Sequence, residues 1–249
     1  DQQKRQYDHM MAIYAAMIDE VDKNIGKLVD ALRQRGQLDN TLIMFLSDNG
    51  GNAEAGIPGK YKGDNPGDAH SDVFIGRCWA HLNNTPFRKY KHYNHEGGIA
   101  TPLIAHWPAA VVPRTGPTGW IDTPTHVIDL MATCVDLAET TYPATFKGND
   151  ITPLQGQSLR PLLTGKGAFA ARPLFWEHEG NAAVRIGDHK LVRQGLNGQW
   201  ELFDLMADRT EQHNLATDAP DQVDQFKATW LTWARAAHVI PKPQPAKKK

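Results

Sequence analysis

The sequence contains little cysteine, no long apolar run and no excess of charge of either sign. Cys78 and Cys134 are the 2 cysteines among 249 residues. Their separation matches no metal or redox spacing, which excludes a disulfide-dense scaffold and leaves a single bridge open. No apolar stretch reaches the roughly 18 residues that span a bilayer. Lysine and arginine total 27 against 28 aspartate and glutamate, so no net field directs the chain to nucleic acid or an anionic membrane.

The remaining composition is typical of a folded protein. Hydrophobic residues make up 41% and charged residues 22% of the chain, far from the composition of disordered segments. The first residues form no signal peptide and include no initiator methionine. We take this as a hint that upstream residues have been removed, with a processed N-terminus as the alternative. The alternating prolines and lysines of residues 241–249 predict a solvated tail.

The first part of the chain alternates helical and strand patterns. Apolar residues at three-and-four spacing predict an amphipathic helix over about 8–35, which ends at Gly36. The apolar run 41–46 predicts a strand buried on both faces, and a second strand and a helix are expected at 101–107 and 126–139. This alternation indicates an α/β fold with a parallel sheet. Residues 52–84, rich in Gly, Asp, Asn and Pro, predict a long loop that shapes a site.

The pattern changes after residue 165. Short strands are expected at 173–177, 182–186, 189–193 and 200–205, with a hairpin turn at Gly187-Asp188 and a final helix over about 220–237. This order predicts a small antiparallel sheet packed by a helix. We therefore predict two domains, residues 1–165 as part of an α/β core and residues 166–249 as a C-terminal subdomain with a basic tail.

Asp48 and Asn49 lie at the end of the first predicted strand, after Ser47. Ligands in α/β sheets gather at the carboxyl ends of strands, and a carboxylate beside an amide oxygen suits calcium or magnesium. Calcium usually takes six to eight oxygens, so other ligands must come from elsewhere. As a bare pattern, Asp-Asn-Gly after a strand is more often a turn than a metal site.

Lys91 lies in a stretch crowded with cations and aromatic residues, which the pair Gly97-Gly98 closes. A lysine ammonium suits a tetrahedral oxyanion such as sulfate or phosphate and can stabilise charge on a leaving oxygen. A solvated basic loop is an equally good interpretation of the stretch. His95 could contact the same anion, although a lone loop histidine is more often structural.

His178 is flanked by Glu177 and Glu179 near the end of a predicted strand. It is a candidate substrate or metal contact, and an ordinary polar residue at a rim is the more frequent case. The sequence has no zinc-ligand spacing, no Gly-rich nucleotide-phosphate loop and no Gly-x-Ser-x-Gly motif. These absences leave the common metalloprotease, nucleotide-binding and serine-hydrolase functions without support.

Several of these segments together resemble the type I, formylglycine-dependent sulfatases across nearly the whole chain. The segments that carry the resemblance are residues 14–22, 42–50, 91–98 and 102–108, then 156–163, 174–177, 201–205 and 211–215. The resemblance implies an alkaline-phosphatase-like α/β core, present in part. In that family Asp48 and Asn49 would match a metal-ligand pair and Lys91 the sulfate-binding lysine.

The resemblance also implies a reaction, the hydrolysis of an aryl or carbohydrate sulfate ester. A formylglycine hydrate would attack sulfur while Ca²⁺, or Mg²⁺, polarises the sulfate and Lys91 clamps it. His95 and His178 are further candidate substrate contacts. The expected partner is a sulfated small molecule or glycan, with no nucleic acid, no membrane span and no prediction of oligomeric state. The family tendency is towards a periplasmic or secreted location.

The chain differs from the family pattern because it lacks the motif that supplies the nucleophile. Neither cysteine lies in the Cys/Ser-x-Pro/Ala-x-Arg motif that yields formylglycine, and the family's N-terminal aspartate pair is absent from the chain. We therefore expect a C-terminal portion that is inactive alone. Two alternatives stay open: a related phosphatase or phosphotransferase, against which Lys91 before Glu96-Gly97-Gly98 argues, and a non-catalytic protein that binds sulfated ligands.

Overall fold

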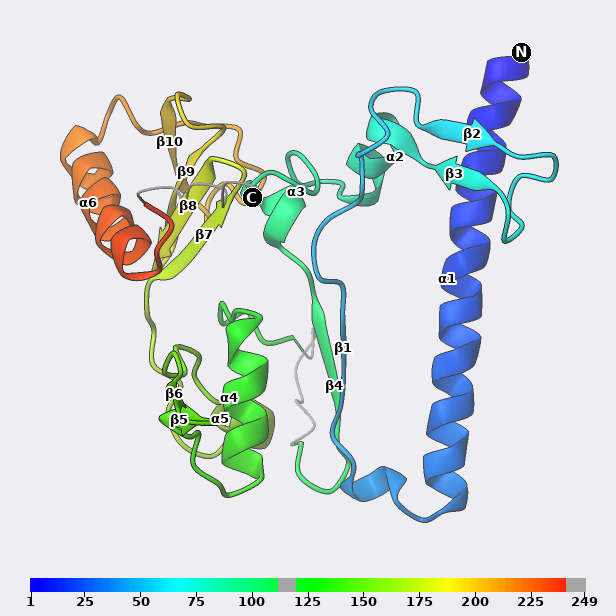
Figure 1. The fold of residues 1–249 in the computed structure, drawn as a ribbon. Coiled ribbons are helices and arrows are strands. Elements are labelled where there is room, and N and C mark those ends of the chain that lie inside the picture. The colour runs from blue at the N-terminus through cyan, green and yellow to red at the C-terminus, as the bar shows by residue number, and fades with distance from the viewer. Residues whose placement is uncertain (112–119, 241–249) are drawn as a thin grey trace. The chain divides into compact units, whose positions relative to one another are not determined.

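The computed structural model describes residues 1–111 and 120–240 (Figure 1). Its backbone forms two compact units, one of residues 1–21, 49–101 and 172–249 and one of residues 22–48 and 102–171. The predicted division at residue 165 stays a prediction, and the predicted tail from Pro241 lies outside the described residues. Cys78 and Cys134 are both free and exposed, so neither forms the bridge that the sequence left open.

A four-stranded antiparallel sheet organises the first unit, as the sequence predicts. Its strands pair in the order β10-β9-β8-β7. The bounds are β7 Leu174–His178, β8 Asn181–Ile186, β9 His189–Arg193 and β10 Trp200–Asp204. Ile186 pairs with His189, which confirms the two-residue turn at Gly187-Asp188. The left-handed backbone of Gly187, with φ of 59°, is the conformation that such hairpin turns require.

Helix α6 (Pro220–Ala236) covers one face of this sheet, beside β7 to β10 (Figure 1). Pro220 occupies its first turn, where a missing N–H leaves no hydrogen bond unmade. The core combines one stripe of the helix with alternate strand residues. Its buried members are Ala182, Val184, Leu191, Leu202, Val223, Phe226, Trp230 and Ala234. This is the antiparallel sheet with a packing helix that the periodicity predicts.

The same unit contains the segment in which the sequence predicts only a loop, and that prediction is incomplete. Residues 52–84 include an antiparallel hairpin of β2 (Lys60–Lys62) and β3 (Asp72–Phe74), followed by α2 (Gly76–Asn83). The strands are three residues each, too short for a periodic signal. The one-turn helix α3 (Glu96–Ile99) follows.

Helix α1 (Gln2–Gln34) confirms the amphipathic helix and begins earlier than the periodicity predicts. Gly36, with φ of 64°, lies just beyond its end, where the left-handed conformation stops a helix. Part of the apolar stripe is exposed to solvent: Met17, Ile18, Val21 and Leu28 are each 50–55% exposed. A short 3-10 turn, Leu38–Asn40, comes next.

The second unit is built around β1 (Ile43–Leu46) and β4 (Leu103–His106). They pair antiparallel in a two-stranded sheet, so the expected parallel pairing is wrong for these strands. The predicted burial of β1 on both faces is also wrong, because Phe45 is 46% exposed. The unit further contains α4 (Ile128–Leu137), α5 (Arg160–Thr164) and the short hairpin of β5 (Thr145–Phe146) and β6 (Asn149–Asp150).

None of the described helices combines the length and the apolar character that crossing a bilayer requires.

Candidate active site

The segment from Lys91 to Gly98 is held in its course by backbone contacts that exclude side chains. A Cβ atom on Gly97 would lie 2.3 Å from the carbonyl oxygen of Arg88, and one on Gly98 would lie 1.9 Å from that of Tyr93. Both positions therefore require glycine. The Gly97 N–H donates to the Arg88 oxygen at 2.8 Å, which folds the segment back on itself and fixes the side chains between these points.

The turn after Asn49 packs against this segment. The Gly50 N–H donates to the Gly98 oxygen at 3.1 Å, and the Lys91 N–H donates to the Gly51 oxygen at 3.1 Å. A Cβ atom on Gly50 would lie 1.9 Å from the Gly97 oxygen, so this approach depends on glycine. The fold therefore brings Asn49 and Lys91, which the sequence singles out separately, within the same backbone network.

Asp48 and Asn49 lie just beyond β1, which confirms their position after a strand end. Asp48 is exposed and Asn49 is half-buried. A carboxylate and an amide oxygen are hard donors that fit calcium or magnesium. Two donors fall short of the six to eight oxygens that calcium takes, so these residues fit part of a cage. Their role as metal ligands stays a prediction.

Lys91 meets a carboxylate that the sequence does not single out. Its Nζ atom lies 2.6 Å from Oε1 of Glu54, and both side chains remain partly exposed, at 30% and 43%. The hydrogen bond and the charge of Lys91 lower the pKa of Glu54. Glu54 is therefore ionised at neutral pH. The Lys91 ammonium stays partly accessible to an anion that would compete with Glu54.

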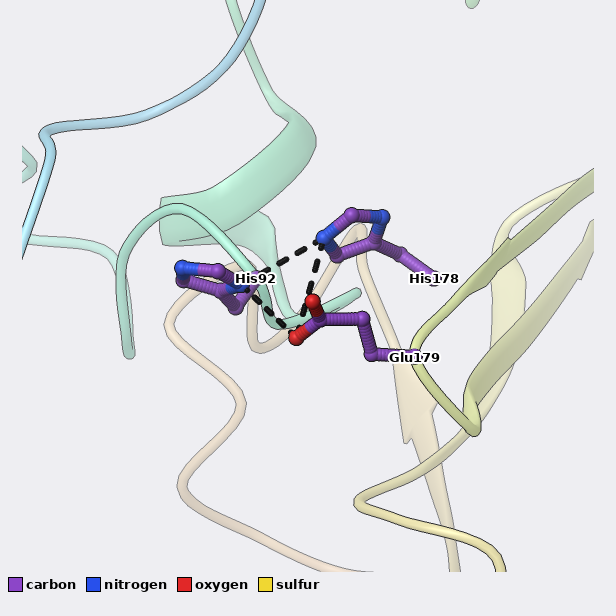
Figure 2. A group of neighbouring side chains, drawn as sticks. All are labelled: His92, His178 and Glu179. Carbon is purple, nitrogen blue, oxygen red and sulfur yellow. Dashed lines mark hydrogen bonds and ion pairs between the residues drawn. The ribbon is translucent and has the colours of Figure 1, made fainter. Parts of the chain in front are cut away.

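His92, the residue after Lys91, lies beside His178 (Figure 2). Nδ1 of His92 lies 3.3 Å from Nε2 of His178 and 3.0 Å from Oε2 of Glu179. The buried Asn181 donates to the carbonyl oxygens of both histidines, at 2.8 and 2.9 Å. This amide fixes the main chain of the two segments, so the three side chains converge from a stable frame.

Buried charges anchor the other end of the segment to the sheet. Lys190 of β9 has no exposed surface, and its Nζ atom lies 2.8 Å from Glu96 and 2.9 Å from Glu211. Burial raises the pKa of Glu96 but is outweighed by the charge and hydrogen bond of Lys190, so this pKa is lowered. Burial raises the pKa of Glu211 despite the same lysine. One buried ammonium is thus shared between two buried carboxylates.

His95 is buried beside this cluster. Its Nε2 atom lies 3.1 Å from Oε2 of Glu201, while its buried Nδ1 atom has no hydrogen-bond partner among the described residues. Burial, with opposition from the Glu201 hydrogen bond, lowers the pKa of His95 to about 4. The ring is therefore neutral at neutral pH. Its predicted contact with substrate stays a prediction, for which Nδ1 is the available atom.

The segment from Lys91 to Gly98 has a partly exposed end and a buried end. Lys91 and His92 present a cation and an imidazole at a partly exposed surface, while His95 and Glu96 fix the segment through buried contacts. A positioned ammonium can bind an oxyanion and stabilise charge on a leaving oxygen. No side chain that these contacts bring together is an activated serine or cysteine nucleophile.

Comparisons with known proteins agree with this geometry. The fold is part of an alkaline-phosphatase-like core, which solved structural neighbours of the chain share. The chain belongs to the sulfatase family, whose pattern matches residues 1–140. Residues 87–230 further match the family described as N-sulphoglucosamine sulphohydrolase, C-terminal. The second match includes Lys91, His92 and the four-stranded sheet of β7 to β10.

Individual relatives support the same assignment. The chain is 32% identical to an uncharacterised sulfatase of Schizosaccharomyces pombe, over 94% of this chain and 45% of that protein. It is 32% identical to an arylsulfatase of Klebsiella aerogenes, over 66% of this chain and 37% of that one. The solved structure of Ps i-CgsB with k-i-k-neocarrahexaose matches 89% of this chain and 42% of its own, with TM-score 0.65 and 26% identity. The chain thus spans less than half of these relatives.

Sequence reasoning missed the partners of the predicted residues. Glu54 lies 37 residues before Lys91, and Glu179 lies 87 residues after His92. The carboxylates on either side of His178 were a signal, because they mark a polar turn at a strand end. Nothing in the sequence around Glu54 or Glu201 distinguishes them from other surface carboxylates.

Proposed function

We propose that this chain forms the C-terminal part of a sulfatase that hydrolyses an aryl or carbohydrate sulfate ester. Membership of the sulfatase family supports the reaction class. The observation that carries the proposal is Lys91, whose backbone N–H is bonded to Gly51 in the turn after Asn49 and whose ammonium stays partly exposed beside Glu54. The proposal assigns sulfate binding to this lysine.

In the proposed reaction Asp48 and Asn49 supply two oxygens to a calcium ion, which would polarise the sulfate when bound. Lys91 holds a sulfate oxygen and stabilises charge on the oxygen of the departing alcohol. His95 and His178 are proposed as further contacts for the sulfated substrate. The nucleophile, a formylglycine, is proposed to lie on a segment outside these 249 residues, in a protein directed to the periplasm or secreted.

The first test reads the coding sequence immediately upstream of Asp1. We expect a Cys/Ser-x-Pro/Ala-x-Arg motif in frame. An upstream segment without this motif would remove the nucleophile and favour the non-catalytic ligand-binding alternative. The present chain, purified alone, is expected to be inactive, and turnover by it would contradict the requirement for another segment.

The second test measures hydrolysis of 4-nitrophenyl sulfate by the whole protein that carries this chain. Lys91→Ala should lower kcat/KM by about 100-fold or more, because removal of one positioned transition-state donor has an effect of this size. Removal of calcium by a chelator should abolish turnover. Lys62→Ala is the matched control, since Lys62 is an exposed lysine of β2 and should leave kcat/KM unchanged.

The two variants separate the reaction from the assignment of the residue. If the whole protein hydrolyses the ester and Lys91→Ala is as active as Lys62→Ala, the sulfatase function holds and the role of Lys91 is wrong. If the protein carries the upstream motif and shows no calcium-dependent hydrolysis of any aryl or sugar sulfate, the proposed function is wrong.

A further inference from the structure

Three side chains from two distant parts of the sequence converge on one point beside Lys91. His92 belongs to the Lys91 segment, whereas His178 and Glu179 lie at the end of β7 and the turn after it. The stick view shows the two rings and the carboxylate pointing towards one another (Figure 2). Among the described residues, this is the group of three histidine, cysteine or acidic side chains whose ligand atoms all lie within 4.8 Å of one another.

Two of the three distances among the ligand atoms are close to those around a small tetrahedral cation, and the third is longer. Nδ1 of His92 lies 3.0 Å from Oε2 of Glu179 and 3.3 Å from Nε2 of His178. The third edge, from Nε2 of His178 to Oε2 of Glu179, is 4.0 Å. Zinc bonds to nitrogen and oxygen of about 2.0–2.1 Å place tetrahedral ligands about 3.3 Å apart. The triangle therefore needs only small side-chain movements to close around zinc.

We propose that His92, His178 and Glu179 form a zinc-binding site. Two neutral imidazoles and one carboxylate are a donor set that zinc takes with an open fourth position for water. Without the metal, a single proton on Nδ1 of His92 can satisfy both neighbours. When zinc bonds to all three atoms, the ring proton of His92 would move from Nδ1 to Nε2, so that the imidazole stays neutral and Nδ1 is free for the metal. In this site His178 would be a metal ligand. The site is separate from the predicted calcium site at Asp48 and Asn49, whose donors are oxygens.

The surroundings of the triad order it for this role. Asn181, which is 7% exposed, donates to the main-chain oxygens of both His92 and His178. Its own Oδ1 atom accepts from the Gly195 N–H at 2.9 Å. The amide thus cannot turn away without losing a third bond. Ligand orientation by such neighbouring groups is a common property of metal sites.

A carboxylate on the far side of His92 completes the arrangement. Oε1 of Glu54 lies 3.8 Å from Nε2 of His92, the ring nitrogen that does not face the triad. This distance is longer than a hydrogen bond. A carboxylate that accepts the N–H of a metal-bound histidine fixes the ring and raises its basicity as a ligand, so Glu54 would take this role only after a small side-chain movement. The two carboxylates near the site, Glu54 and Glu179, carry more negative charge than Lys91 carries positive charge. A zinc ion at the triad would therefore add positive charge where negative charge is in excess.

The test uses the full chain in excess calcium, so that oxygen sites for hard cations are occupied. Titration with Zn²⁺ in a calorimeter should show a single tight site, and Co²⁺ should produce the visible absorption of a tetrahedral nitrogen and oxygen site. His178→Gln and Glu179→Gln should each raise the zinc dissociation constant by about tenfold or more, since even changes behind the ligands have effects of this order. His92→Gln should have the same result.

His213→Gln is the matched control, because His213 also lies near a carboxylate, 3.5 Å from Asp208, and is 83% exposed. This variant should bind zinc as the unmodified chain does. The proposal is overturned if the unmodified chain shows no tight zinc site. It is equally overturned if the triad variants bind as tightly as the unmodified chain, or if His213→Gln weakens binding as much as they do. Substrate turnover enters none of these measurements, so the result is independent of the proposed function.

Discussion

The two ends of the segment from Lys91 to Gly98 make similar ion pairs in opposite surroundings. At one end, Lys91 and His92 pair with Glu54 and Glu179 at a partly exposed surface. At the other, Glu96 pairs with the fully buried Lys190. Exposed pairs contribute little to stability because water screens them, whereas a buried charge left without its partner is strongly destabilising. The buried end therefore fixes the segment, and the exposed end can exchange its partners for ligands.

Loss of the buried lysine should have the largest effect on stability. Lys190→Met leaves Glu96 and Glu211 without their shared ammonium, in surroundings where both are at most 5% exposed. We expect the free energy of unfolding to fall by about 3–5 kcal/mol, the usual result of breaking a buried pair. Urea denaturation followed by circular dichroism measures the change.

Two comparisons make this prediction specific. Lys91→Met, the same substitution at the exposed end, should change the free energy of unfolding far less. Adding Glu96→Gln and Glu211→Gln to Lys190→Met should recover part of the loss, because the unpaired charges are then removed. Equal losses for Lys190→Met and Lys91→Met would show that the difference between the two ends is wrong.

His95 should give the buried end a dependence on pH. Its folded pKa of about 4 lies below the ordinary value of 6.5, so between these values the unfolded chain binds more protons. The free energy of unfolding should therefore fall as pH is lowered from about 6.5 towards 4, by at most about 1.4 kcal/mol per pH unit for this group. Glu201, Lys190 and Arg88 are the charged groups that act on the ring.

Denaturation of His95→Gln across this pH range isolates the contribution of the ring. The variant should show a shallower loss of stability between pH 6.5 and 4, while His213→Gln, at a histidine that is 83% exposed, should follow the unmodified chain. If His95→Gln and the unmodified chain lose stability in parallel, the burial of His95 does not control its protonation.

The fold was predictable where local signals decide it. Strands β8 and β9 have a Gly-Asp turn between two apolar runs, and α6 has a proline at its start and one apolar stripe. The pairing of β1 with β4 was not predictable, because residues 43 and 106 meet across a long stretch of chain. A short continuous apolar run does not distinguish a strand of a parallel sheet from a core strand of an antiparallel one.

The candidate site was predictable only in part for the same reason. The sequence singles out Lys91 as a candidate through its family-like spacing to Glu96-Gly97-Gly98, which is a local signal. Its partner Glu54, and the meeting of His92 with Glu179, depend on contacts across 37 and 87 residues. The proposed zinc ligands therefore have no short spacing that a motif could describe. The burial of Lys190 in a strand is likewise invisible to a pattern in which lysine predicts an exposed face.

The smallest effect on stability is expected at Glu54, where binding should change instead. Lys91 lowers the pKa of Glu54 by its hydrogen bond and charge, so the carboxylate is ionised and competes with an anion for the ammonium. Glu54→Gln should leave the free energy of unfolding unchanged within error. It should raise the affinity of the whole protein for inorganic sulfate severalfold at low ionic strength, where screening is weak.

Calorimetric titration with sulfate measures this affinity, and Asp72→Asn provides the control. Asp72 is a carboxylate of similar exposure, 46% against 43% for Glu54, and it pairs with Lys60 in the β2-β3 hairpin. Its substitution changes the net charge equally, so a gain shared by both variants would be a general effect of charge. A gain confined to Glu54→Gln would show that Glu54 and sulfate compete for Lys91. A loss of affinity would instead show that Glu54 holds the ammonium in its binding position.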